Sequence, residues 1–395
     1  EEKHRFNVFA SAQHINRDSY YGGGQDPNAY GNTTDLNWMA GSQYVYSFAK
    51  CIFMPSDLTA GIEFNQDKLE DNMWGYNRTV DQKVNIGSAF LQNEWKNEHW
   101  GFLIGGRLDK HNLIDHVIFS PRANLRYNPT ENINLRFSYS SGFRAPQAFD
   151  EDLHVENVGG NVAMVELADN LKEERSQSLS ASADIYHRFG AFQVNFLVEG
   201  FYTKLSDVFA LTDGETVDGI LTRTRYNAPG ARVMGLTLEG KMAYLTKFQL
   251  QAGVTLQQSH YSEPHVWNPD APAVKKMMRT PNTYGYFTAT YTPIKPLSIA
   301  LSGTYTGSML VPHEPVPGFL ENPITVNTKD FFDIGLKAAY DFKLYKSMNL
   351  QVNAGIQNIF NAYQNDFDKG ADRDSGYIYG PSLPRSFFAG VKISY

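Results

Sequence analysis

The sequence predicts an all-β fold, a transmembrane antiparallel β-barrel, and three observations lead to this prediction. The first is a strict alternation of apolar and polar side chains from residue 387 to the final aromatic, Tyr395. Because successive side chains of a strand point to opposite faces, this segment has one apolar face. The second is a series of similar segments along the chain, and the third is the alternating length of the gaps between them. An apolar strand face that ends on an aromatic residue is typical of an outer-membrane barrel.

The composition fits this fold and excludes other classes. The 395 residues include 14% aromatics and 32 glycines, and the mean hydropathy is −0.41. No stretch is apolar enough for a spanning helix of about 20 residues. A net charge of −7 argues against nucleic acid as a partner, and a single cysteine, Cys51, excludes an internal disulfide framework. No signal peptide is visible at Glu1, so we expect that it has been removed or that the chain starts late.

A period-two pattern predicts about sixteen strands. They lie near 4–18, 34–49, 57–69, 83–96, 99–112, 115–128, 132–142, 176–189, 191–211, 220–245, 247–261, 282–293, 296–309, 330–343, 348–362 and 378–395. Polar faces of this length do not suit a sandwich core, because burying an unpaired polar group costs several kcal/mol. They suit a lumen that is filled by water or by a plug.

The gaps between the predicted strands alternate between short turns and long polar loops. The long gaps lie at 19–33, 70–82, 143–175, 212–219, 262–281, 310–329 and 363–377, and the short gap at 112–115 is the exception. Outer-membrane barrels have short periplasmic turns and longer extracellular loops. With the C-terminus in the periplasm, the short gaps fall inside and the long gaps outside. We therefore expect the long loops to gather at one rim and to form the outer wall of a ligand vestibule.

The alternation also predicts which side chains face lipid and which face the lumen. We expect Leu250, Val254, Leu301, Val391 and Ile393 to face lipid, and Gln249 and Gln251 to point inward. Four arginines lie on polar strand faces: Arg107, Arg122, Arg126 and Arg136. An arginine that faced lipid at mid-membrane depth would be costly, so we expect these four to contact a plug or lumen water.

Several motifs follow one another in a recognisable order. They are SGFRAPQ at 141–147, FDEDL at 149–153, NLKEERS at 170–176, YNAPGARVMG at 226–235, QNIFN at 357–361, YGP at 379–381 and PR at 384–385. Together, from about Ala60 to Tyr395, they resemble the C-terminal barrel of TonB-dependent outer-membrane receptors.

The resemblance implies a barrel of about 22 strands with an N-terminal plug in its lumen. We interpret residues 1–395 as the C-terminal portion of such a barrel, with about 16 of the strands, and with about six strands and the plug absent. The segments 4–18 and 378–395 should then not pair with each other. A passive porin, the alternative, would close its barrel within this chain, because closure requires every edge to be paired.

The resemblance also implies a function in the outer membrane of a Gram-negative bacterium. The protein would be a receptor that binds a scarce, bulky nutrient at its outer loops and imports it with energy from TonB, without covalent chemistry. Its partners would be outer-membrane lipid, TonB through the missing plug region, and a surface lipoprotein. An enzyme would need a nucleophile and a base at one rim, and no serine and histidine are spaced to provide them.

The cargo is predicted from three segments. Residues 149–154, together with 358–360 and 377–381, resemble Bacteroidetes receptors for cobalamin or iron-siderophores. We favour cobalamin, and an iron-siderophore or haem is the alternative. Aromatic residues in the outer loops either stack on such a ligand or form an aromatic girdle at the membrane interface. They are Tyr20, Tyr21, Tyr30, Trp74, Tyr76 and Trp267.

Metal sites are the remaining candidates. Asp366, Asp368, Asp372 and Asp374 crowd one outer loop, either as ligands for structural calcium or as solvated loop acids. Asp150, Glu151 and Asp152 have the same two interpretations. His260, His265 and His313 lie in or near outer loops and either ligate iron or a corrin metal or are ordinary surface histidines. Cys51 is expected to be a free thiol in a periplasmic turn at 50–56.

Overall fold

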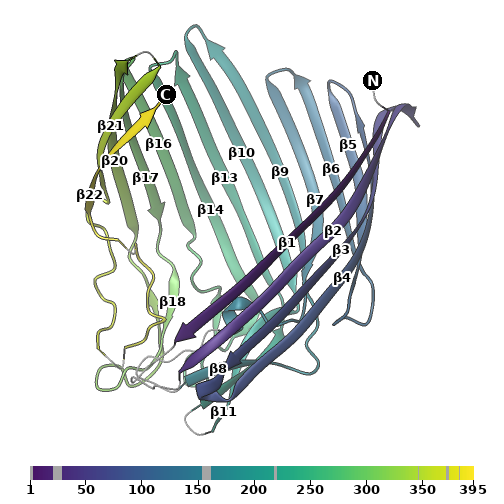
Figure 1. The fold of residues 1–395 in the computed structure, drawn as a ribbon, viewed down its shortest axis with the longest axis vertical. Helices are drawn as coiled ribbons and strands as arrows, with labels where there is room; N and C mark the ends of the chain where they lie inside the picture. Colours follow the sequence, from purple (N-terminus) through teal and green to yellow (C-terminus); the bar gives the residue numbers. More distant parts are fainter. Residues whose placement is uncertain are drawn as a thin grey trace.

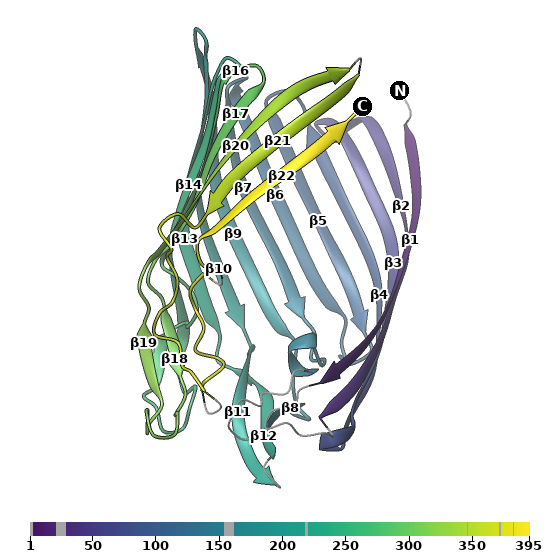
Figure 2. The same cartoon turned by 60° about the vertical axis from the view of Figure 1, so that its left-hand side comes forward.

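The computed structural model describes residues 3–20, 29–153, 162–217, 220–345, 347–370, 373–381 and 383–395. In these residues, 17 strands form one antiparallel sheet that curves into the wall of a barrel (Figures 1 and 2). The wall strands are β1 (His4–Tyr20), β2 (Tyr30–Cys51), β3 (Met54–Met73), β4 (Arg78–Lys96), β5 (Trp100–His111), β6 (Ile118–Thr130), β7 (Ile133–Arg144), β9 (Glu174–Phe189), β10 (Phe192–Ser206), β13 (Ala231–Tyr244), β14 (Phe248–His265), β15 (Val274–Lys276), β16 (Thr283–Ile294), β17 (Leu297–Thr306), β20 (Phe331–Tyr345), β21 (Met348–Gln357) and β22 (Ser386–Ser394).

Smaller elements lie in the connections. Two further sheets are formed by β8 (Val162–Leu167), β11 (Val208–Val217) and β12 (Ile220–Ala228), and by β18 (Leu310–His313) and β19 (Ile324–Asn327). Two 3₁₀ turns, η2 (Trp74–Tyr76) and η3 (Asp150–Leu153), complete the elements that we discuss. Within the described ranges, no helix has the length and apolar character needed to cross a membrane. The three sheets, which contain the great majority of the described residues, confirm the all-β prediction.

Each wall strand pairs with the next wall strand along the chain, except that the short β15 and the following β16 both pair with β14. Where a loop element intervenes, β7 pairs with β9, β10 with β13, and β17 with β20. Over the described residues, β1 pairs only with β2, and β22 pairs only with β21. The prediction that the first and last strands do not pair is confirmed.

The connections are sorted by length between the two rims. Short turns join β2 to β3, β4 to β5 and the corresponding later pairs at the rim where both termini lie (Figures 1 and 2). The long connections, with β8, β11 and β18, lie at the opposite rim (Figure 1). Cys51 ends β2 at a short turn and is a free thiol, as predicted. Outer-membrane barrels have their longer loops on the extracellular side, so we call this opposite rim the loop rim.

The predicted loop at 70–82 is wrong. β3 and β4 pair in register from Ser56 opposite Trp95 to Met73 opposite Arg78, and only η2 and Asn77 connect them. The polar residues that suggested a loop are cross-strand neighbours instead. A strand that extends beyond the membrane needs backbone pairing but no apolar side chains, so polarity alone did not identify its end.

Other predicted boundaries also need correction. The segment 191–211 contains β10 and the start of β11, and the segment 220–245 divides into β12 and β13. Consequently the predicted loop at 212–219 lies largely within the β11–β12 hairpin. The C-terminal strand begins only at Ser386, not at 378, and β14 continues to His265. The errors at 191–211 and 220–245 arose because a loop strand has the same alternation as a wall strand.

The strand register separates an apolar face from a polar face. Residues that oppose each other across neighbouring strands share a face. Leu250 lies opposite Met242 and Ala289, and the row continues through Leu301, Leu336 and Ile356 to Phe387. The five residues that were predicted to face lipid all lie on this apolar face. Gln249 and Gln251 lie on the other face, as predicted.

The polar face lines the concave side of the sheet. The Gln251 amide donates to the hydroxyl oxygen of Tyr286 at 2.8 Å, and the Tyr286 hydroxyl donates to Glu239 at 2.5 Å. The turn η3 lies inside the curve of the sheet (Figures 1 and 2), next to the polar-face residues Arg17 and Gln82. The polar face is therefore the lumen face, and the apolar face is the outer face.

Aromatic side chains mark the end of the outer face at the short-turn rim. The ring of Trp100 stacks on Tyr127 at 4.1 Å and on Phe102 at 5.6 Å, and Phe53 stacks on Trp95 at 5.6 Å. Such girdles lie at the membrane–water interface of outer-membrane barrels.

The two faces predict different costs for the same substitution. In the intact receptor that carries this chain, Val254→Arg should destabilise the barrel by about 2–4 kcal/mol, because it places a charge in lipid. The control Gln251→Arg lies on the lumen face of the same strand and should cost less than about 1 kcal/mol. Urea unfolding in lipid bilayers measures both. Equal costs would contradict the assignment of the faces.

Candidate functional site

The connection between β7 and β9 folds onto the lumen face near the loop rim and turns through η3. Gln82 of β4 holds its start, since its amide donates to the Ala148 carbonyl at 3.2 Å and its oxygen accepts from the Ala148 N–H at 2.7 Å. Asp152 then closes the turn by accepting the Phe149 N–H at 2.8 Å. The segment is thereby fixed to the barrel wall on the side that faces the lumen.

A buried ion pair holds this segment to two other parts of the chain. Arg225 of β12 contacts both carboxylate oxygens of Asp152, at 2.6 and 2.7 Å, and their side chains are only 7% and 2% exposed. Arg78 of β4 donates to the Asp152 carbonyl at 2.8 Å and lies 3.5 Å from Asp71. A bidentate arginine–carboxylate pair fixes both position and orientation. The Arg225–Asp152 pair joins β12 to η3, and Arg78 joins β4 to η3.

Two arginines and two phenylalanines pack together beside this pair. We call Arg144, Phe149, Phe209 and Arg225 the Arg–Phe cluster. The guanidinium carbon of Arg144 lies 3.9 Å from the ring centre of Phe149, and that of Arg225 lies 5.5 Å from it. Cations over aromatic rings at such distances are attracted to the face of the ring. The cluster connects β7, the η3 segment and the β11–β12 hairpin.

A pocket of about 260 Å³, lined by both charged and apolar side chains, lies between η3 and the lumen face of β1 to β4. Arg17, Asp35, Asp67 and Asp150 are among its charged lining residues. Its volume falls below the roughly 300–1,000 Å³ typical of small-molecule pockets. A bulky ligand would therefore contact this pocket with one part and rest on the surrounding loops with the rest.

Two other loops of the same rim are held together by a second buried pair. The Nε2 atom of His313 lies 2.9 Å from Asp368, and the His313 ring stacks on Tyr377 at 3.8 Å. Tyr377 and Tyr379 both donate hydrogen bonds to Asp366, at 3.2 and 2.6 Å. Burial alone would raise the pKa of Asp366, but hydrogen bonds from the two hydroxyls, the backbone and Gln364 together hold the pKa below its ordinary value.

The predicted ligand-stacking aromatics do not form one group. Tyr20 and Tyr30 lie opposite each other at the loop-rim end of β1 and β2, with 4.7 Å between their ring centres. The alternation along both strands places them on the outer face, where a girdle aromatic would lie. Trp74 is 64% exposed at the β3–β4 tip, next to the half-buried Tyr76. Trp267 is half-buried, and its indole N–H has no hydrogen-bond partner within the described ranges. Tyr21 lies outside the described residues.

The predicted metal ligands are occupied by protein partners. Asp366 and Asp368 accept the hydrogen bonds given above, and Asp374 accepts the backbone N–H groups of Glu314 and Gly376, at 2.9 and 2.7 Å. Asp372 lies outside the described residues. In the part of the chain that is described, no three His, Cys, Asp or Glu side chains are placed to hold a metal ion together. Calcium at this loop stays a prediction.

The histidines that were considered as metal ligands are also dispersed. His313 pairs with Asp368, and the His265 ring lies tilted against the Tyr261 ring, with 4.8 Å between the ring centres. His260 lies on the outer face, opposite Arg232.

The four predicted lumen arginines lie on the polar face. Arg107 contacts Glu63 at 2.9 Å, Asp109 at 2.8 Å and Ser88 at 2.7 Å. Arg122 donates to Gln92, Arg126 to the Asn97 carbonyl and Arg136 to Asn134. Contact with a plug stays a prediction for all four.

Sequence reasoning missed the residues that order the rim. Arg17, Arg78 and Arg225 were not singled out, although the motif containing Arg144 and the acids at 150–152 were. Arg17 lies in the predicted strand 4–18, where parity places it on the lumen face, so it was identifiable, whereas Arg78 lies in the segment that was wrongly predicted as a loop. The pairing of Arg225 with Asp152 joins loops far apart in sequence, and no local pattern indicates it.

The buried pair predicts an unequal effect of two adjacent substitutions. Asp152→Asn leaves Arg225 buried without its counter-charge, which costs about 3–5 kcal/mol in comparable pairs. The control Asp150→Asn removes an exposed contact with Arg17 (33% and 72% exposed side chains), which is worth about 0–1 kcal/mol.

Hydrogen exchange of residues 145–153 in the intact receptor measures the difference. Asp152→Asn should raise the local opening equilibrium about a hundredfold or more, since 1.4 kcal/mol is a factor of ten. The barrel strands should keep their protection. Equal exchange in the two variants would remove the proposed role of the ion pair.

Comparison with known proteins agrees with this architecture. The family model described as TonB dependent receptor-like, beta-barrel matches residues 3–359. A search of curated proteins finds no match. Solved structures of similar fold include the siderophore receptor PirA from Acinetobacter baumannii, with TM-score 0.70 and 15% identity over 98% of this chain and 59% of that one.

Two further solved structures have the same fold. The ferric enterobactin receptor PfeA from Pseudomonas aeruginosa gives TM-score 0.68 and 16% identity, over 99% of this chain and 59% of that one. The ferric-catecholate import receptor Fiu from E. coli K12 gives 0.70 and 14%, over 99% and 62%. The chain thus spans about three-fifths of the length of these receptors. It belongs to the TonB-dependent receptor family, as part of an outer-membrane β-barrel.

Proposed function

We propose that this barrel wall belongs to a receptor that binds a ferric siderophore at the loop rim and imports it with energy from TonB. The observation that carries the proposal is a barrel with a polar lumen whose loop rim is built from ordered, inward-folded segments. An inward-folded loop would also suit a passive porin, but a porin closes its barrel by pairing its first strand with its last. Over the described residues β1 pairs with β2 alone and β22 with β21 alone, which favours part of a larger receptor barrel.

The similar structures support the class of ligand. They are receptors for siderophores, for ferric enterobactin and for ferric catecholates. At 14–16% identity this likeness extends to the fold, so the ligand is our proposal for this chain. It replaces cobalamin as the first choice.

The chemistry of the lumen face near the loop rim also supports an anionic chelate. The cationic groups are those of the Arg–Phe cluster on the inward-folded segment, where Arg144 lies over the Phe149 ring, and Arg17 of the adjacent pocket, which Asp35, Asp67 and Asp150 also line. Arginine recognises anionic oxygens through several N–H donors, and the aromatic rings supply contact area. A ferric catecholate carries both features, negative charge and planar rings.

Cobalamin is the second candidate, because the segments at 149–154 and 377–381 resemble receptors for cobalamin as well as for iron-siderophores. The first segment forms the η3 turn and ends outside the described residues. The second supplies Tyr377 and Tyr379, which hold the other loop pair. Both segments therefore lie where a cargo would first be met.

The remaining parts of the proposal concern partners. Arg107, Arg122, Arg126 and Arg136 would face a plug that fills the lumen, and TonB would act on that plug from the periplasm. The four side chains are paired with polar groups of the wall and keep donors toward the lumen. A surface lipoprotein would add a further contact at the loop rim.

Direct binding separates the candidate ligands. The purified intact receptor should bind ferric enterobactin, or another ferric catecholate, at sub-micromolar concentration by isothermal titration calorimetry. Cyanocobalamin and haem, tested in parallel, should bind at least a hundredfold more weakly. Tight binding of cyanocobalamin alone would restore the first ligand that the sequence suggested, and binding of none of the three would reject the siderophore proposal.

An exposed tryptophan provides a test at a single position. Trp74→Ala should weaken ligand binding about tenfold, or about 1.4 kcal/mol, because an aromatic anchor would be lost from the rim. Trp100→Ala is the control, since Trp100 lies at the opposite rim on the outer face. Trp267→Ala should act like Trp74→Ala if both loops close on the ligand. If Trp100→Ala weakened binding as much as Trp74→Ala, the effect would come from barrel stability.

A further inference from the structure

A row of basic side chains crosses the outer face close to the loop rim. Lys204 of β10 lies directly opposite Arg232 of β13, Arg232 lies opposite His260 of β14, and His260 lies opposite Lys276 of β15. Because directly opposite residues share a face, all four side chains project from the outer face. We call Lys204, Arg232, His260 and Lys276 the basic row.

The basic row is not balanced by acidic groups. Within the described ranges, Lys204, Arg232 and Lys276 make no ion pair or side-chain hydrogen bond. Like charges directly opposite each other on a sheet are destabilising, so the arrangement costs stability unless an anion lies against it. Lys68 and Lys83 also lie opposite each other on the outer face, but acidic residues balance their charge. Lys68 forms an ion pair with Glu70, and Glu70 lies opposite Asp81.

The depth of the basic row matches the level of lipid headgroups. From the aromatic Phe192 at the short-turn end of β10 to Lys204, the strand rises about 40 Å at about 3.3 Å per residue. With a strand tilt of about 40°, the row lies about 30 Å above Phe192, just beyond an apolar band about 25 Å tall. Lys204 and Arg232 also lie within two residues of the strand ends at Ser206 and Ala231.

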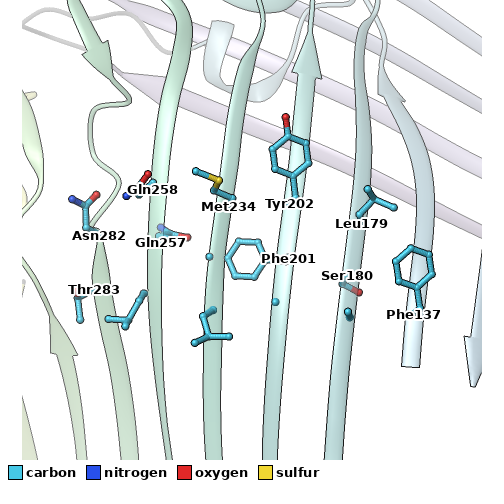
Figure 3. A pocket seen from close by; sticks show the side chains of 15 residues that line it. Phe137, Leu179, Ser180, Phe201, Tyr202, Met234, Gln257, Gln258, Asn282 and Thr283 are labelled. Carbon is cyan, nitrogen blue, oxygen red and sulfur yellow. The ribbon is translucent and has the colours of Figure 1, made fainter. Parts of the chain in front are cut away.

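An apolar groove of about 840 Å³ lies on the same strands (Figure 3), and its lining residues Tyr202, Met234 and Gln258 are each two residues from a member of the basic row. Its floor on the outer face contains Ala181 and Gly200, and Leu179, Tyr202 and Leu256 border it. A Cβ built on Gly200 would meet no atom within 4 Å, so the groove is open there. Figure 3 shows the rings of Tyr202 and Phe201 on neighbouring positions of the same strand, with the Tyr202 hydroxyl toward the loop rim.

The two features have the spacing of a lipid. Tyr202 lies two residues from Lys204, about 7 Å along the strand, and Gly200 lies four residues from it, about 13 Å. A phosphate against the basic row would thus place the first carbons of its acyl chain beside Tyr202 and the following ones over Gly200. Charge complementarity and apolar contact would be satisfied by one molecule.

We propose that this surface binds a phosphate-bearing lipid of the outer leaflet, with the phosphate on Lys204, Arg232 and Lys276 and an acyl chain in the groove over Gly200. A free anion would use only the basic row, and a second copy of the chain would bring the same positive charges to the contact. The site lies on the outer face, away from the lumen and loop surfaces that would bind cargo.

The test uses the purified intact receptor in detergent, with lipid A carrying two phosphates as the probe and native mass spectrometry as the readout. The triple variant Lys204→Ala, Arg232→Ala, Lys276→Ala should lower the bound fraction at least tenfold. The control Lys68→Ala, Lys83→Ala removes two positive charges from a balanced patch of the outer face and should leave binding within twofold.

A second variant separates a lipid site from simple charge attraction. Gly200→Leu fills the groove without changing charge and should lower the retention of lipid A at least threefold. Dephosphorylated lipid A tests the phosphate contact: it should bind the wild-type receptor as weakly as intact lipid A binds the triple variant. The proposal fails if the triple variant retains lipid A like wild type. It also fails if Gly200→Leu has no effect, or if the control loses as much lipid as the triple variant. Ferric-siderophore binding, measured in the same variants, should not change, so the two proposals can fail independently.

Discussion

A backbone that crosses a bilayer must satisfy every peptide N–H and C=O group within the protein, because the hydrocarbon offers no partner. The other features of this structure depend on that constraint. Continuous pairing from β1 to β22 satisfies it along the wall, except at the outer edges of β1 and β22, each of which has one partner strand over the described residues. Pairing in register also forces side chains to alternate strictly between two environments, since a shift of one residue would exchange the faces. The outer face and the lumen face are thus consequences of one hydrogen-bond pattern.

The loop rim is stabilised by a different principle. Loops outside the membrane can bond to water, so their order comes from specific buried pairs. Asp152 with Arg225 fixes the η3 segment, and His313 with Asp368 fixes the loops near Tyr377. A buried ion pair adds little net stability but penalises every arrangement that separates its charges. These pairs therefore favour one loop arrangement, which a receptor needs if a few contacts are to select its ligand.

The sequence predicted the wall better than the rim. Alternation found the sixteen long strands and both faces, because lipid on one side and water on the other impose period two on every wall strand. It failed at 70–82, where the hairpin of β3 and β4 extends beyond lipid and carries polar residues on both faces. It also could not indicate that Arg225 meets Asp152, or that Lys204, Arg232 and Lys276 form a row. Those contacts depend on register between strands, which no single segment of sequence records.

The central claim, that one strand face meets lipid and the other meets the lumen, can be measured directly along β14. Spin labels at successive positions from 248 to 258, in a Cys51→Ser background, report collision with oxygen dissolved in lipid and with a water-soluble nickel complex. We predict a period of two, with oxygen accessibility highest at even positions such as Leu250 and Val254 and nickel accessibility highest at odd positions such as Gln251. A flat profile, a period near 3.6, or the opposite phase would contradict the account.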